Sequence, residues 1–97
     1  MDRPPYNIRQ EIPDVPDGTV LRMTSREWSH SAAYPPGAYV DMTVSRVHRK
    51  CIRVQRGVLW VWVVGHRHPD CTWPHVEHHV PCLQMLVRVD TLRRAVQ

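Results

Sequence analysis

The feature that most constrains the fold is an unbroken apolar run from Val58 to Val64, bounded by Gly57 and Gly65. The run is rich in β-branched and aromatic residues and is too short for a typical core helix, so it predicts a strand. Because both faces of this strand are apolar, it should be central, covered on both sides, or part of an interface. Arg56-Gly57 before it predicts a tight turn, since glycine adopts positive φ without steric cost.

Other segments show the period of two that is typical of a half-buried strand. The alternating apolar residues are Val40, Met42 and Val44 in one segment, and Leu83, Met85, Val87 and Val89 in another. Residues 20–24, after the turn signal Asp17-Gly18, and residues 51–55 predict two more strands. Asp90 or Thr91 is positioned to cap a short C-terminal helical turn.

With 97 residues, the chain has room for one domain. About five strands with one short helical turn predict an all-β fold, a small antiparallel β-barrel of the SH3-like or OB-like kind. Residues 1–17 are rich in proline and predict an extended N-terminal arm, with Ile8 and Ile12 as possible anchors. The barrel then spans residues 18–97, with a loop at 25–37 in which Trp28 is expected to act as a lid on the core.

Composition excludes some classes of protein. No apolar run approaches the roughly 18–20 residues of a membrane span, and the N-terminus lacks the apolar region of a secretory signal. We therefore expect a cytoplasmic protein without a membrane partner. Three cysteines, an odd number, favour reduced thiols or metal ligands over a disulfide framework, and Cys51 is expected to be a buried core thiol.

The most concentrated chemical feature is the loop at 65–82, where five histidines and two cysteines fall between His66 and Cys82. Two ligand-like pairs predict a structural zinc site: Cys71, His75, His79 and Cys82. His66 or His68 could replace either histidine. The spacing differs from common zinc patterns, so an unmetallated loop and a Cys71–Cys82 disulfide remain alternatives.

Catalysis is not expected. Glu77 is a candidate base, but neither an H-E-x-x-H pattern nor the signature of the zinc deaminases is present. The sequence therefore predicts a protein that is not an enzyme.

Positive charge is concentrated in one segment. The chain has a formal net charge of +4, while residues 46–56 alone carry +5 and residues 1–17 carry −2. The basic residues of this segment are Arg46, Arg49, Lys50, Arg53 and Arg56. They are expected on a strand end, a turn and the next strand, as a hairpin edge that contacts phosphates. A merely solvated hairpin, or docking to an acidic protein surface, are the alternatives, and arginine-rich coding bias could contribute to the count.

Trp60 and Trp62 share one face of the predicted strand at 58–64. An outward orientation would make them a stacking platform for unpaired bases. The chain has no phenylalanine to fill its interior, so we expect both side chains to lie in the core.

These features predict a non-catalytic β-barrel module that docks an acidic partner, nucleic acid first among them, with zinc in the His/Cys loop. The alternative is a structural or assembly subunit of a larger complex, such as a phage or secretion particle or an accessory factor of an enzyme. That alternative rests on the apolar strand at 58–64, which could mediate a protein complex or homo-oligomer, and on the proline-rich arm.

Overall fold

The computed structural model describes residues 12–68 and 82–97, which form one antiparallel sheet and one short helix. The elements in chain order are β1 (Val20–Met23), β2 (Trp28–Ser29), β3 (Val40–Gln55), β4 (Val58–Arg67), β5 (Leu83–Arg88) and α1 (Val89–Ala95). The strand order is β1-β3-β4-β5-β2. The predicted all-β class, with five strands and a C-terminal helical turn, is confirmed.

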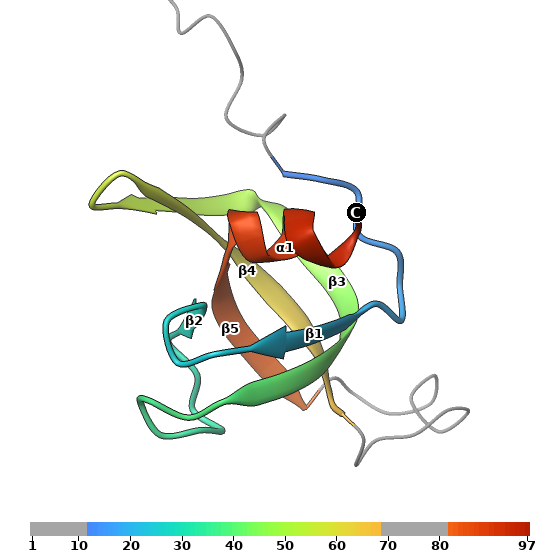
Figure 1. The fold of residues 1–97 in the computed structure, drawn as a ribbon, viewed down its shortest axis with the longest axis vertical. Helices are drawn as coiled ribbons and strands as arrows, with labels where there is room; N and C mark the ends of the chain where they lie inside the picture. Colours follow the sequence, from blue (N-terminus) through green and yellow to red (C-terminus); the bar gives the residue numbers. More distant parts are fainter. Residues whose placement is uncertain (1–11, 69–81) are drawn as a thin grey trace, which may run out of the picture.

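The sheet curls into a nearly closed barrel (Figure 1). β3, β4 and β5 form a meander, while β1 pairs with β3 and β2 pairs with β5 at the two opposite edges. Only residues 24–27 connect β1 to β2, so this short connection brings the two edges of the sheet together. α1 lies over one open end of the barrel (Figure 1). Within the described ranges, no helix has the length and apolar character needed to cross a bilayer.

The core confirms the alternating patterns in the sequence. Buried apolar side chains come from all five strands and from α1: Leu21, Met23, Trp28, Val40, Met42, Val44, Val61, Val63, Leu83, Met85, Val87, Val89 and Leu92. Ile12 also lies in this core, so the end of the proline-rich segment is anchored to the barrel. Trp28 is the expected lid, and its indole Nε1 donates a hydrogen bond to the Ala38 carbonyl oxygen at 2.8 Å.

The middle of the chain differs from the prediction. β3 is one continuous 16-residue strand, whereas two strands with a turn between them were expected. The pairing with β4 shifts between Val44 and Arg46 and again between His48 and Ile52, where residues 49–51 have no partner opposite. Such bulges absorb extra residues without ending a strand. The sequence also does not predict β2, which pairs with β5. A strand of two residues is too short to show an alternating pattern.

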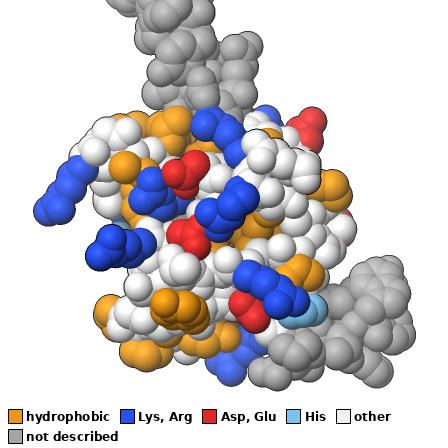
Figure 2. All heavy atoms as spheres, viewed as in Figure 1, with side chains coloured by type: hydrophobic (Ala, Val, Ile, Leu, Met, Phe, Trp, Pro, Cys, Tyr) orange, Lys and Arg blue, Asp and Glu red, His pale blue; other side chains and the backbone are white. Residues whose placement is uncertain are grey.

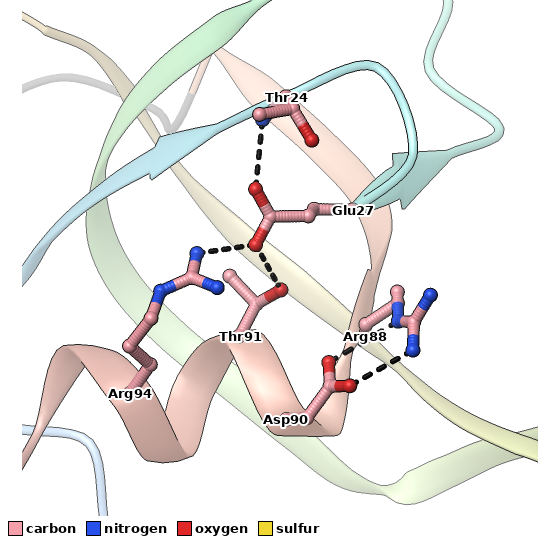
Figure 3. Close-up of polar contacts among 6 residues, drawn as sticks. All are labelled: Thr24, Glu27, Arg88, Asp90, Thr91 and Arg94. Carbon is pink, nitrogen blue, oxygen red and sulfur yellow. Dashed lines mark hydrogen bonds and ion pairs between the residues drawn. The ribbon is translucent and has the colours of Figure 1, made fainter.

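The beginning of α1 differs as well. The helix starts at Val89 with Arg88 at the N-cap, and no side chain caps it. Asp90 instead forms an ion pair with Arg88 at 2.9 Å, and the Thr91 hydroxyl donates to Glu27 at 2.8 Å (Figure 3). The predicted capping residues therefore act on neighbouring side chains.

β3 and β4 extend past the rest of the sheet as a two-stranded arm (Figure 1). β1 pairs only with residues 40–43 of β3, and β5 pairs only with residues 60–65 of β4. We call residues 46–59 the basic arm: residues 46–53 lie beyond the pairing with β1 but opposite the part of β4 that pairs with β5, and residues 54–59 extend past both neighbours. Its tip is the predicted turn, with φ of 52° at Arg56 and 78° at Gly57. Two consecutive positive φ values are typical of a type I′ hairpin turn, which favours Asn-Gly.

Replacing Arg56 by asparagine should stabilise the protein by about 0.5–1 kcal/mol, because asparagine tolerates the left-handed conformation better than arginine does. Urea unfolding followed by circular dichroism measures the change. Arg46→Asn is the control, since it removes the same charge from extended backbone, where asparagine is disfavoured. A loss of stability in Arg56→Asn would contradict the turn geometry.

Candidate functional site

The basic arm places the five predicted contact residues together. Arg46, Arg49, Lys50 and Arg53 all belong to β3, and Arg56 lies in the turn. The prediction that they span a strand end, a turn and a second strand is therefore wrong, because the bulge keeps β3 continuous through the basic segment. Figure 2 shows basic side chains at the outer end of the arm, and a mixture of basic and acidic side chains nearer to α1.

Arg49 contacts the N-terminal segment, although its side chain stays 42% exposed. Its guanidinium donates to the carbonyl oxygens of Ile12 at 2.8 Å and Pro13 at 3.1 Å, and to the carboxylate of Asp14 at 3.2 Å. Since Ile12 is buried in the core, these bonds hold residues 12–14 against β3. Arg49 therefore has a structural role that its position in the sequence does not reveal.

The other basic residues of the arm remain exposed. These exposed residues are Arg46, Lys50, Arg53 and Arg56. Within residues 12–68 and 82–97, no ion pair neutralises any of these four side chains. The arm thus presents uncompensated positive charge.

Trp60 and Trp62 do not lie in the core, and that prediction is wrong. Val61 and Val63 are the fully buried residues of β4, so the alternation of the strand directs both tryptophans to the outer face. Each tryptophan is half-buried there. Leu86, which pairs with Trp62 on β5, is fully buried but does not belong to the cluster that fills the barrel. Directly paired residues share a face of the sheet, so Leu86 lies on the same face as Trp62.

The strand register sets basic residues beside these rings. Trp60 pairs with Arg53, Trp62 with His48, and Val64 with Arg46. The Arg53 guanidinium lies 5.9 Å from the centre of the Trp62 ring, within the range of a cation–π contact. We call this set the Trp–Arg face: Arg46, His48, Arg53, Trp60 and Trp62.

A further detail concerns Trp60. Its indole Nε1 is buried and has no hydrogen-bond partner among the residues that the structure describes. Unsatisfied buried donors are rare in folded proteins, and each one carries a cost. The indole N–H of Trp60 is therefore a polar group that these residues leave unsatisfied.

Cys51 is exposed in the bulge, so the expectation of a buried core thiol is wrong. Cys51 is one of the residues without a partner on β4, and Ile52 after it pairs with Val61. The exposure of Cys51 therefore depends on this pairing, which the sequence does not show.

The predicted zinc site cannot be assembled from the described residues. Cys71, His75 and His79 lie outside them, as do Glu77 and the proposed Cys71–Cys82 disulfide. Cys82 is described and exposed, and its Sγ accepts a hydrogen bond from the backbone N–H of Arg67 at 3.2 Å. In the described ranges, no group of three or more His, Cys, Asp or Glu side chains could hold a metal ion. The zinc site therefore stays a prediction.

The two alternative histidine ligands lie at the end of β4 and just after it. His66 is buried, and Nδ1 of His68 lies 3.3 Å from the Thr43 hydroxyl. The backbone N–H of His68 also donates to the Asp41 carbonyl oxygen at 3.1 Å. These contacts attach the start of the His/Cys loop to β3.

Sequence reasoning missed one open pocket of about 280 Å³ beside β2. Its lining residues are Ser25, Trp28, Ser29, His30, Ser31, Tyr34, Pro36 and Gly37. His30 adopts a left-handed φ of 58°, and the Ser29 hydroxyl is hydrogen-bonded to its Nδ1. Among the described residues no carboxylate orients this histidine, so the pair lacks the third group of a nucleophile triad.

The chain matches no protein-family model, and neither a curated protein nor a solved structure is significantly similar to it.

Proposed function

We propose that this protein is a non-catalytic β-barrel module that binds nucleic acid through its basic arm. One observation carries the proposal: exposed arginines and a lysine, which form no ion pair with the residues that the structure describes, lie beside two tryptophans on the outer face of the sheet. Arginine donates to phosphate oxygens in a bidentate geometry, and a row of such donors attracts a polyanion.

The placement of the charge also favours this reading. Among the described residues, no strand pairs with the free edge of β3 beyond Thr43, and residues 54–59 also extend past β5, so a ligand can approach the arm along this edge and at its tip. Charge that is not consumed by internal pairing is available to phosphates, whose neutralisation releases counterions. Arg49 is the exception, since its guanidinium already holds residues 12–14.

The test is a fluorescence-anisotropy titration against single-stranded and double-stranded DNA and RNA at several salt concentrations. Affinity should fall steeply as salt rises, and Arg46→Gln/Lys50→Gln should weaken binding about 5- to 20-fold and flatten the salt dependence. The matched control is Arg22→Gln/Arg26→Gln, which removes the same charge from exposed positions on and after β1.

Two outcomes would reject the proposal. The first is that none of the probes binds at about 25 mM salt, where phosphate contacts are strongest, or that any binding does not weaken as salt is added. The second is an equal loss of affinity in the control variant, which would mean that only the overall charge matters.

The assembly alternative has weaker support. Val61 and Val63 of the apolar strand fill the protein's own core, and only its outer face is left for a partner. Exposed Val54 on the arm is the observation in its favour. A stable oligomer in size-exclusion chromatography with light scattering, together with no nucleic-acid affinity, would favour this alternative.

A further inference from the structure

From the Trp–Arg face we infer that the nucleic acid bound is single-stranded, with unpaired bases stacking on Trp62 and Trp60. This inference rests on the proposed function and adds the class of ligand. Both rings lie on the outer face of β4, because Val61 and Val63 occupy the inner one.

The separation of Trp60 and Trp62 along β4 also favours an unpaired strand. Side chains two positions apart on a strand are separated by about 6.8 Å, which is twice the rise of roughly 3.4 Å between stacked bases in a duplex. Two rings at that separation therefore do not match successive stacked bases. They match an extended strand whose bases have separated, which is the form that aromatic platforms bind in single-stranded nucleic acids.

The burial of the two tryptophans limits how bases can reach them. Trp60 and Trp62 are half-buried in the sheet surface and so cannot act as wedges that enter a duplex. In a duplex the flat faces of the bases are covered by their neighbours, whereas an unpaired strand exposes them. Half-buried rings on the sheet surface therefore favour the unpaired strand, whose bases can reach them.

Arg53 covers the ring on which a base would stack. Its guanidinium covers Trp62 at 5.9 Å in the free protein, and this contact is weaker than the stacking of a base on an aromatic ring. An incoming base can therefore displace Arg53 from the ring. The released guanidinium then lies within the basic arm, where it can bind the phosphate next to that base.

The experiment compares a labelled strand of about 12 nucleotides, DNA or RNA, with the matching duplex. We expect the single strand to bind more tightly and to quench tryptophan fluorescence. Trp62→Leu should weaken single-strand binding roughly 5- to 100-fold and leave duplex binding and the salt slope unchanged. Tyr39→Leu is the matched control: Tyr39 is an aromatic residue with 76% exposure, next to the opposite end of β3.

Because Trp62→Leu could disturb the packing of Leu86, Trp60→Phe/Trp62→Phe serves as a second variant. It keeps aromatic rings on the outer face, so binding should persist within a few-fold while the quenching is lost. Persistent quenching in this variant would place the contact at another tryptophan and overturn the inference.

The remaining outcomes separate the two proposals. A duplex that binds as tightly as the single strand, with Trp62→Leu affecting both equally or neither, overturns the single-strand inference and leaves the proposed function standing. No binding of either probe at low salt rejects both. Binding that falls only in Trp62→Leu and only for the single strand supports both.

Discussion

Gly65→Ala should destabilise the protein by about 2–4 kcal/mol, a large fraction of the stability of a domain of this size. Gly65 is buried in β4 and pairs with Val44 at the point where the register with β3 shifts. A Cβ atom there would lie 2.3 Å from the carbonyl oxygen of Thr43 and 2.9 Å from Cγ of Met42. The side chain of Met42 can move, but the backbone of Thr43 is held in the sheet, so the strands themselves would have to separate.

Chemical denaturation of the purified variant measures this loss. Gly37→Ala is the control, because Gly37 has a φ of +91° with open space where a Cβ atom would lie, and so tests backbone strain alone. It should cost about 1–2 kcal/mol. Stability of Gly65→Ala within about 0.5 kcal/mol of the wild type would mean that β3 and β4 do not approach each other this closely.

Gly65 also illustrates what the sequence could predict and what it could not. The apolar run at 58–64 correctly predicts a strand, but the pattern places its end at Gly65, whereas β4 continues to Arg67. Glycine inside a strand often marks the close approach of another backbone. That approach depends on β3, which lies about 20 residues earlier in the chain, and no local pattern contains it.

The same reasoning explains the error at Trp60 and Trp62. A strand that is apolar on both faces has two equivalent orientations by local pattern, and only pairing decides between them. By contrast, Val40, Met42 and Val44 alternate with polar residues, and their inward orientation was predicted correctly. Patterns with one polar face determine orientation, and patterns without one do not.

The basic arm was predictable in content but not in geometry. Its charge is visible in the sequence, whereas the bulge at 49–51 depends on pairing with β4. The contact of Arg49 with the N-terminal segment was equally unpredictable, since two of its acceptors are backbone carbonyls, which any residue provides, 36 and 37 positions earlier in the chain.

Glu27→Gln should destabilise the protein by about 2 kcal/mol at neutral pH. The Glu27 carboxylate connects the β1–β2 turn to α1 (Figure 3). It accepts hydrogen bonds from the Thr24 backbone N–H at 2.9 Å and the Thr91 hydroxyl at 2.8 Å, and it forms an ion pair with Arg94. Glutamine has nearly the same shape, but its NH₂ group would face one of these donors and it carries no charge.

Asp90→Asn is the matched control, because it also neutralises a carboxylate in an ion pair with arginine. The Asp90 side chain is 57% exposed, against 12% for Glu27. Exposed ion pairs contribute little, so this variant should lose less than about 1 kcal/mol. Equal losses in the two variants would contradict the special role of Glu27.

The contribution of Glu27 should also depend on pH in a defined direction. Burial by itself raises the pKa of Glu27, but the hydrogen bonds from Thr24, Arg94 and Thr91 together lower it from 4.5 to about 2. A carboxyl group whose pKa is lower in the folded state stabilises the fold above its unfolded pKa and loses that effect as pH falls toward the folded value. The difference in unfolding free energy between wild type and Glu27→Gln should therefore have its largest value above about pH 5 and shrink toward zero near pH 2.

Urea unfolding of both proteins at a series of pH values measures this difference directly, and other titrating groups, the histidines included, cancel in the comparison. A difference that stays constant down to pH 2 would show that the carboxylate acts through packing, and not through the charge that its three partners stabilise.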